Sequence, residues 1–202
     1  MKIICVGRNY VAHAKELNNE VPSRPLLFMK PDSSVLHRER PFYYPDFSEN
    51  VHYEAEIVLK ICKNGRSVEK QFAHKYYDEM TIGLDLTARD LQSELKAKGH
   101  PWEIAKAFDN SAVLGKWIPF GDADPTDVHF HLKKNGETVQ QGHTANLIFP
   151  FDELISYISR FFKLQMGDII FTGTPAGVGP IAIGDQFQGF IEEQPLLNLL
   201  VK

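Results

Sequence analysis

Short apolar runs separated by turn residues recur along the chain, a pattern typical of β-strands. They predict strands at residues 3–6, 51–59, 81–85, 168–172 and 186–192. Stretches rich in helix formers predict helices at residues 10–18, 86–98 and 151–162. The expected fold is therefore mixed and mostly β, with a few helices.

Proline and glycine mark where these elements end. Five prolines between residues 20 and 50 favour extended segments and turns there. Asn64-Gly65 and Asn135-Gly136 each stand between apolar runs, and both predict hairpin turns because Asn and Gly adopt positive φ readily. Since no repeat, low-complexity tract or linker interrupts the pattern, one domain over residues 1–202 is expected.

Composition narrows the possible partners. A chain of 202 residues can bury one sizeable core, and a formal net charge of -4 offers no basic surface for nucleic acid. No apolar stretch is long enough to span a membrane and the first residues lack a signal-type cleavage site, so a soluble, cytoplasmic protein is expected. Cys5 and Cys62 lack the spacing of metal ligands and are expected to be reduced core residues.

Candidate chemistry begins with two carboxylates. Glu54 and Glu56 stand two apart in the run 51–59, so a strand would point both to one face, and Asp85 ends the run 81–85. Carboxylates held side by side resist ionising unless a cation neutralises them, and three on strands form an oxygen site suited to Mg²⁺ or Mn²⁺. The alternative is that the two glutamates form the solvent face of a half-buried strand, the commoner case for a lone E-x-E.

Six segments in order extend over nearly the whole chain. They are residues 6–10 with His13 and Glu16 following, 25–31, 53–56, 83–92, 101–109 and 172–179. Together they resemble the fumarylacetoacetate hydrolase family in its short single-domain form. The resemblance implies a β-roll like that family's C-terminal domain, with a few helices and with sheets that surround a metal site.

The same resemblance implies roles for individual residues. Glu54, Glu56 and Asp85 would hold Mg²⁺ or Mn²⁺, and the lysine matching Lys106 lies beside the metal-bound substrate in the family. Arg89 and Gln92 would share a helix face and contact the substrate carboxylate. Lys106 could instead be a solvated surface lysine, and Arg89 could instead pair with Asp90 or Glu94 on an exposed helix.

Two further segments complete the candidate site. In the glycine-rich loop 172–179, the resemblance favours Thr174 and the neighbouring Gly173 for binding a carboxylate, although such loops are also ordinary turns. His13 and Glu16, three apart on a helical turn, are the candidate acid–base pair, and the family places the matching pair on a lid. On their own, such residues are more often a surface pair. No ligand role is assigned to the remaining histidines, among them His52, His129 and His131.

The function implied is a divalent-metal-dependent C–C bond hydrolase or decarboxylase acting on small 2-oxo acids through a metal-stabilised enolate. Its reactions would be 3-acylpyruvate hydrolysis and oxaloacetate decarboxylation. The sequence leaves open a keto–enol tautomerase or isomerase of 2-oxo dicarboxylates and a non-catalytic metal-binding module. The family resemblance and the 11% aromatic content also predict a homodimer.

Overall fold

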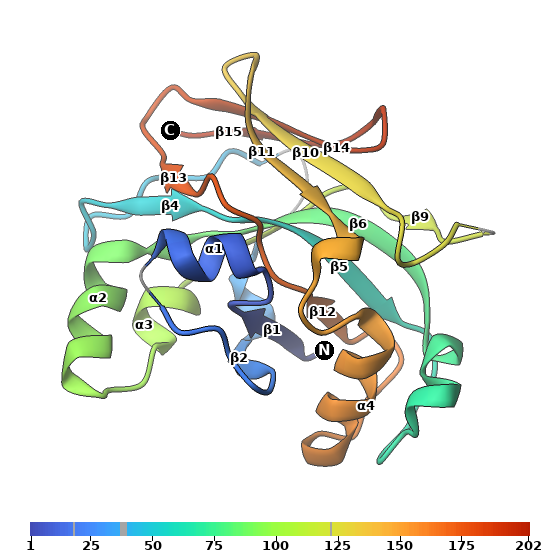
Figure 1. The fold of residues 1–202 in the computed structure, drawn as a ribbon. Coiled ribbons are helices and arrows are strands. Elements are labelled where there is room, and N and C mark those ends of the chain that lie inside the picture. Colours follow the sequence, from blue (N-terminus) through green and yellow to red (C-terminus); the bar gives the residue numbers. More distant parts are fainter. Residues whose placement is uncertain (18, 37–39, 122) are drawn as a thin grey trace.

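Three β-sheets form the framework of the structure, a computed structural model that describes residues 1–17, 19–36, 40–121 and 123–202 (Figure 1). The largest has eight strands. In order they are β2 (Leu26–Lys30), β1 (Ile3–Gly7), β12 (Ile169–Phe171), β5 (Ala55–Ile61), β6 (Tyr77–Asp85), β8 (Ala112–Leu114) and β3 (Val35–Leu36), with β9 (Ile118–Pro119) also on β6. The pairs β1–β12 and β3–β8 are parallel, whereas the other neighbours run antiparallel.

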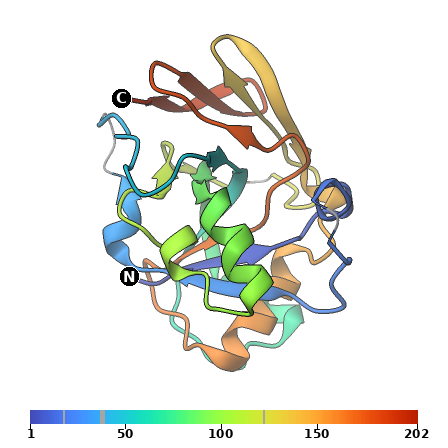
Figure 2. The same cartoon turned by 90° about the vertical axis from the view of Figure 1, so that its left-hand side faces the viewer.

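Two smaller sheets complete the β-structure. The four-stranded sheet has the order β11 (Glu137–His143), β10 (His129–Lys134), β14 (Gln186–Ile191), β15 (Gln194–Leu200). The three-stranded sheet has the order β13 (Gly179–Pro180), β4 (Val51–Tyr53), β7 (Thr87–Ala88). Figure 2 shows the four-stranded sheet lying across one end of the molecule, above the main sheet.

Helices are few: in Figure 1, α1 lies in front of the strands, α2 and α3 lie at the left, and α4 lies at the lower right. The α-helices are α1 (Val11–Glu16), α2 (Arg89–Lys98), α3 (Glu103–Lys106) and α4 (Phe151–Phe161). Short 3₁₀ helices are η1 (Asp32–Ser34), η2 (Lys70–Lys75) and η3 (Thr144–Asn146). Of the helices described, none has the length and apolar character needed to cross a membrane.

The central strand β5 is buried on both faces. Ala55, Ile57 and Leu59 point into the larger core, whereas Val58 packs in a second, smaller cluster on the opposite face. Because side chains alternate along a strand, Glu56 shares the face of Val58. The sequence pattern therefore puts a charged residue beside a buried apolar cluster.

The predicted fold class, mostly β with a few helices, is confirmed. The strands at residues 3–6, 81–85, 168–172 and 186–192 form within one to four residues of their expected bounds, as does the helix at 151–162. The helix expected over 10–18 covers Val11–Glu16, and residue 18 lies outside the described residues. Both cysteines are free, as expected, but only Cys5 lies in the core, whereas Cys62 is partly exposed.

Three predictions about local structure need correction. The helix expected from residue 86 begins at Arg89, because Thr87 and Ala88 pair with β4 as a strand. The run 51–59 is not one strand, since Glu54 separates β4 from β5. Asn64-Gly65 is not a tight hairpin turn: a long connection containing η2 joins β5 to β6, and Gly65 pairs with Leu164 instead.

Asn135-Gly136, in contrast, forms the expected hairpin turn between β10 and β11. Asn135 has φ 53° and Gly136 has φ 87°, the left-handed pair that a two-residue turn of this kind requires.

Candidate metal centre

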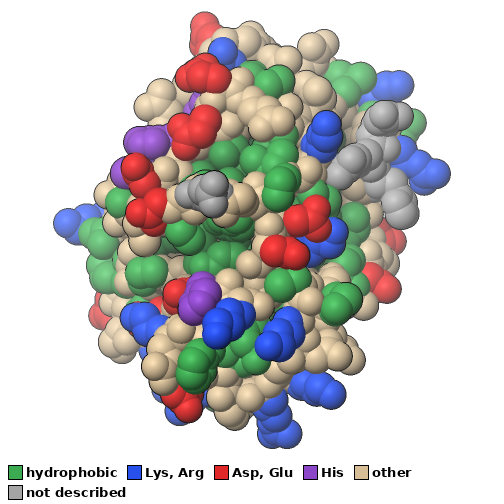
Figure 3. All heavy atoms as spheres, turned by 90° about the vertical axis from the view of Figure 1, so that its right-hand side faces the viewer, with side chains coloured by type: hydrophobic (Ala, Val, Ile, Leu, Met, Phe, Trp, Pro, Cys, Tyr) green, Lys and Arg blue, Asp and Glu red, His purple; other side chains and the backbone are tan. Residues whose placement is uncertain are grey.

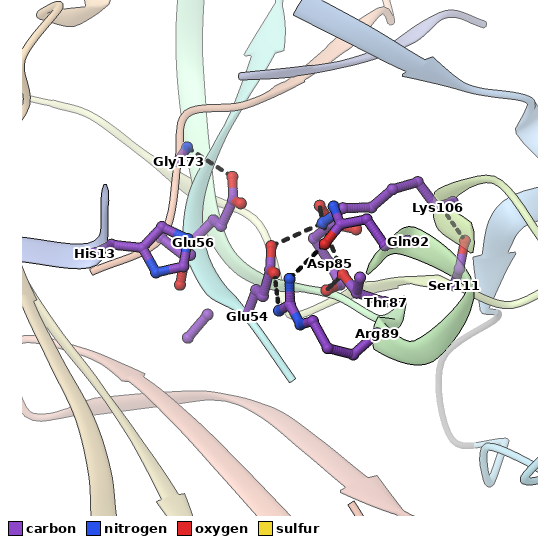
Figure 4. A network of polar contacts seen from close by, with 12 residues as sticks. His13, Glu54, Glu56, Asp85, Thr87, Arg89, Gln92, Lys106, Ser111 and Gly173 are labelled. Atoms are coloured by element: carbon purple, nitrogen blue, oxygen red, sulfur yellow. Dashed lines mark hydrogen bonds and ion pairs between the residues drawn. The ribbon is translucent and has the colours of Figure 1, made fainter. Parts of the chain in front are cut away.

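Three carboxylates converge where the main sheet meets the three-stranded sheet (Figure 4). Glu54 follows β4, Glu56 lies in β5 and Asp85 is the last residue of β6. One oxygen from each lies within 4.8 Å of the others, and all three side chains are buried. The structure therefore brings together the three residues that the sequence singles out, although β4 and β5 are separate strands.

Strand register explains this convergence. Glu56 is paired with Gly83 on β6, and Asp85 follows two residues later on the same face. At Gly83 a Cβ atom would lie 2.7 Å from Val58 Cγ2 and 2.8 Å from Phe171 Cε1, so no larger residue fits without displacing them. Gly83 thus lets β5, β6 and the apolar cluster pack closely beside the carboxylates.

Lys106 is buried and contacts two of the three carboxylates. Its Nζ donates to Asp85 Oδ2 at 2.7 Å, to Glu54 Oε2 at 2.8 Å and to Thr87 Oγ1 at 2.6 Å. Burial lowers the pKa of this ammonium, but Asp85 and Glu54 outweigh that effect and raise it. The alternative of a solvated surface lysine is therefore wrong.

A second buried lysine, Lys30, was not singled out from the sequence. Its Nζ lies 2.8 Å from Asp85 Oδ1 and donates to Ser111 Oγ at 2.9 Å and to the carbonyl of Lys106. The available signal was its place at the end of the apolar strand 26–29, where a lysine enters the interior and needs a partner. Lys30 holds both Asp85 and the backbone that carries Lys106.

Arg89 and Gln92 share one face of α2, as predicted. Arg89 donates to Gln92 Oε1 at 2.6 Å and forms an ion pair with Glu54. It does not pair with Asp90, which accepts from Ser48 Oγ, or with Glu94, which pairs with Lys98.

The pKa values of Glu54 and Glu56 are shifted in opposite directions. Burial raises the pKa of a carboxyl, but Lys106 and Arg89 together hold the pKa of Glu54 well below its usual range. Burial, Asp85 and Glu54 all raise the pKa of Glu56 well above it. Among the described residues Glu56 accepts the backbone N–H of Gly173 at 2.7 Å but has no cationic side chain as a partner.

The lack of a cationic partner at Glu56 among the described residues indicates whether the three carboxylates fit a metal ion. A buried carboxylate that neighbours two others and lacks a cation is stabilised when one is supplied. Oxygen ligands of this kind suit Mg²⁺ or Mn²⁺. The donor set of Glu54, Glu56 and Asp85 therefore fits a divalent cation of this class.

The glycine-rich loop lies beside Glu56. Gly173 has φ 111°, and a Cβ there would lie 2.6 Å from Asn9 Cβ. Since its N–H already donates to Glu56, Gly173 positions a carboxylate in this structure instead of offering a free donor. Thr174 is buried and lines the cavity, and its hydroxyl accepts from Gln140 Nε2 at 2.9 Å. Gln140, from β11, is a further residue that sequence reasoning missed.

His13 and Glu16 form the predicted pair on α1. His13 is buried in the wall of the same cavity, and its Nδ1 lies 3.4 Å from Glu16 Oε2. Burial lowers the pKa of His13, although Glu54 and Glu16 act in the opposite direction. Glu16 also accepts the N–H of Gly177 at 3.0 Å and so joins α1 to the glycine-rich loop.

The cavity that contains these groups is rich in cations. Besides the carboxylates, His13 and Thr174, its lining includes Arg8, Arg89, Lys96 and Lys106. Phe28 and Trp102 add an aromatic wall, with ring centroids 6.2 Å apart. Such a cavity attracts a small anion while its walls limit contact with water.

Comparisons with known proteins show similarity over nearly the whole chain. The family model described as fumarylacetoacetate (FAA) hydrolase C-terminal matches residues 2–198. The oxaloacetate tautomerase of Escherichia coli is 42% identical over 187 residues, covering 92% of this chain and 85% of that protein. A mitochondrial oxaloacetate tautomerase of Arabidopsis thaliana is 44% identical over 186 residues, covering 92% and 83%.

Solved structures are similar as well. Fumarylpyruvate hydrolase from Pseudomonas aeruginosa, in complex with Mn²⁺ and pyruvate, has a TM-score of 0.94 at 38% identity and covers 100% of this chain and 89% of that chain. A fumarylacetoacetate isomerase/hydrolase homologue from Oleispira antarctica has a TM-score of 0.94 at 42% identity and covers 100% and 93%.

Proposed function

This chain belongs to the fumarylacetoacetate hydrolase family, and we propose that it is a divalent-metal-dependent enzyme acting on small 2-oxo acids. The reactions proposed are hydrolysis of 3-acylpyruvates and decarboxylation of oxaloacetate, both of which produce an enolate. One observation carries the proposal: three buried carboxylates converge in a cavity that also holds Lys106 and His13.

Glu54, Glu56 and Asp85 would hold the metal ion, Mg²⁺ or Mn²⁺. When bound, the ion supplies a Lewis acid that stabilises the negative charge of an enolate. The similarity to a fumarylpyruvate hydrolase in complex with Mn²⁺ and pyruvate supports this choice of ion and of substrate class.

The remaining cavity residues would bind and orient the substrate. A 2-oxo acid carries a carboxylate, and the Arg89 guanidinium with the Gln92 amide and the Thr174 hydroxyl can hold it by hydrogen bonds. Lys106 adds a fixed positive charge, stabilised by Asp85 and Glu54. Its position favours the form of the substrate in which negative charge has moved onto the 2-oxo oxygen.

His13 would act as the general base that accepts a proton from water. Because burial lowers its pKa, the imidazole is neutral at pH 7 and can accept a proton from water. The contact of Nδ1 with Glu16 orients the ring and leaves Nε2 for that transfer. Hydrolysis needs this activated water to attack the C4 carbonyl, whereas loss of CO₂ from oxaloacetate does not.

A second candidate is keto–enol tautomerisation of oxaloacetate, which the names of the two curated relatives favour. This reaction passes through the same enolate and needs a group that transfers a proton to or from C3. His13 is available for that transfer. The presence of His13 and Lys106 in the cavity argues against a non-catalytic metal-binding module.

The experiment that tests the proposal compares three reactions in one preparation. Pyruvate release from acetylpyruvate, pyruvate release from oxaloacetate, and ketonisation of enol-oxaloacetate are each measured with EDTA, Mg²⁺ and Mn²⁺. The proposal expects a metal-dependent rate in the first or second reaction. Activity in ketonisation alone would favour the second candidate, and no metal-dependent activity in any would refute both.

We also propose that the protein is a homodimer. A hollow beside η2, η3 and α4 is lined by Tyr77, Leu147 and Phe151, and Figure 3 shows hydrophobic side chains gathered in the middle of this face. Covering such a surface with a second copy would remove apolar area from water. The cytoplasmic location and the single domain stay predictions, and several relatives, that of Arabidopsis thaliana among them, are mitochondrial.

A further inference from the structure

A second group of metal-binding side chains lies on the four-stranded sheet, and it shares no residue with the carboxylate centre. His129 of β10 is paired directly with His143 of β11, and the two imidazole rings stack with centroids 3.9 Å apart and an interplanar angle of 13°. Asp127 lies two residues before His129. Since the side chain between them, Val128, is buried, both of its neighbours point outward.

The ligand atoms of the three side chains lie close together. Asp127 Oδ1 lies 2.9 Å from His143 Nε2 and 3.7 Å from His129 Nε2, and all three ligand atoms lie within 4.8 Å of one another. Figure 3 views this side of the molecule and shows histidine side chains beside acidic ones at its upper left.

These distances match the needs of a particular class of ion. A tetrahedral Zn²⁺ with bonds of about 2.0–2.1 Å requires ligand atoms about 3.3–3.4 Å apart. The two measured separations from Asp127 Oδ1, 2.9 Å and 3.7 Å, lie on either side of that value. Because the two imidazole rings are stacked nearly parallel, the lone pairs of their nitrogens do not aim at one point, so binding would require the His129 ring to turn out of the stack. Side-chain exposures of 60% for His129 and 70% for Asp127 leave room for that rotation.

The backbone holds the ligands in advance. Directly opposite residues on antiparallel strands keep their Cβ atoms about 4.5–5.5 Å apart, so the two imidazoles start from neighbouring positions. The backbone at His129 is held because its main-chain N–H donates to Glu192 Oε1 at 2.8 Å. The backbone at His143 is held because its main-chain carbonyl accepts a hydrogen bond from the hydroxyl of Tyr10 at 3.3 Å.

We propose that Asp127, His129 and His143 form a surface site for a divalent transition-metal ion of the Zn²⁺ class. Two imidazoles and one carboxylate favour such an ion over Mg²⁺, which prefers oxygen ligands. A fourth position is left for water or an external ligand. The bound ion would link the start of β10 to the end of β11.

The test is a calorimetric titration of Zn²⁺ into the wild type and into His129→Ala, both in excess Mg²⁺. Any Zn²⁺ that enters the carboxylate centre contributes equally to both proteins, so the difference reports the surface site alone. The wild type should bind one more equivalent of Zn²⁺ than the variant, or should bind that equivalent at least about 10–100-fold more tightly. Removing a residue that only supports a metal ligand already weakens binding by this factor, so removing a ligand should cost at least as much.

His131→Ala is the matched control. His131 lies on the same strand and face but stacks on Phe190, with ring centroids 4.5 Å apart, and it is not in the cluster. This variant should keep the extra equivalent, whereas His143→Ala and Asp127→Asn should weaken it.

Circular dichroism and the Mg²⁺-dependent activity of each variant confirm that the fold is retained. A second readout uses Co²⁺, because four-coordinate Co²⁺ absorbs strongly in the visible and the wild-type spectrum should exceed that of His129→Ala. Equal Zn²⁺ stoichiometry and affinity in the wild type and His129→Ala, or an equal loss in His131→Ala, would overturn the proposal.

Discussion

At the scale of single residues, the site is a balance of buried charges. Lys30, Lys106 and Arg89 pair with Asp85 and Glu54, while Glu56 is left without a cation among the described residues. The sequence predicts the acidic members, because their spacing on strands is local information. It does not predict Lys30, because the contact of its side chain with Asp85 joins β2 to the end of β6, two strands that are not neighbours in the sheet.

Glu56→Gln should separate metal binding from folding. Loss of the anionic ligand should weaken Mg²⁺ binding by at least about 10–100-fold and reduce activity with it. Without metal, the variant should be more stable, because an amide neither repels Asp85 and Glu54 nor carries a buried charge. A gain of about 1 kcal/mol would raise Tm by about 2–4 °C for a chain of this size.

Calorimetry with Mg²⁺ and thermal unfolding in EDTA measure both effects. Glu79→Gln is the control, since it makes the same change on β6 in a partly exposed residue that pairs with Lys60. If Glu56→Gln binds Mg²⁺ and reacts like the wild type, the carboxylate cluster is not the catalytic site.

His13→Ala should affect the two proposed reactions unequally. Loss of a general base costs on the order of 10²–10⁴ in rate, and only hydrolysis needs an activated water. Acylpyruvate hydrolysis should therefore fall by about that factor while oxaloacetate decarboxylation falls much less. The ratio of the two rates in one preparation is the quantity to measure, because errors in active-enzyme concentration cancel. Equal losses would mean that His13 binds substrate or orders α1 in both reactions.

At the scale of elements, the site depends on where strands stop. Glu54 lies at the break between β4 and β5, and the two strands join different sheets. The apolar pattern of residues 51–59 does not predict this break, because the break arises when β4 pairs with β7 and β13 in another sheet. Asn64-Gly65 failed as a turn for a similar reason, since Gly65 pairs with the distant Leu164.

The glycine-rich loop gives a prediction at this scale. Gly173→Ala should place a methyl group against Asn9 and shift the N–H that holds Glu56, so metal affinity should fall by at least about 10-fold. Gly184→Ala is the control, because Gly184 also has positive φ, at 95°, but a Cβ there meets open space. Each should lose about 1–2 kcal/mol of stability from the strained backbone. Gly173→Ala should lose more than Gly184→Ala, because its methyl group also clashes with Asn9.

Calorimetric Mg²⁺ titrations of the two folded variants make the comparison. Metal affinity reduced equally in both would show that backbone strain alone, and not the position of the Gly173 N–H, determines binding.

At the scale of the whole molecule, three sheets combine to enclose the cavity. Asp85 comes from the main sheet, Thr87 from the three-stranded sheet, and Gln140, which holds Thr174, from the four-stranded sheet. Family resemblance predicted this enclosure, whereas periodicity predicted only the separate strands. Packing between sheets depends on side-chain shapes that no local pattern carries.

Assembly is the prediction that belongs to this scale. Light scattering at micromolar concentration should give about twice the 23.0 kDa mass of the chain, because the apolar hollow beside α4 would be covered in a dimer. The mass should stay the same in EDTA, since the carboxylate centre lies within one chain. A monomeric mass would refute the proposed homodimer and leave the proposed chemistry unaffected.

The central claim is that the buried carboxylate centre forms an enolate from a 2-oxo acid. Exchange of the C3 protons of pyruvate in D₂O, followed by proton NMR, measures enolate formation directly and does not depend on which substrate is preferred. With Mg²⁺ the wild type should accelerate exchange, and EDTA or Glu56→Gln should abolish the acceleration. Exchange that persists in EDTA, or that Glu56→Gln matches at saturating Mg²⁺, would contradict the account.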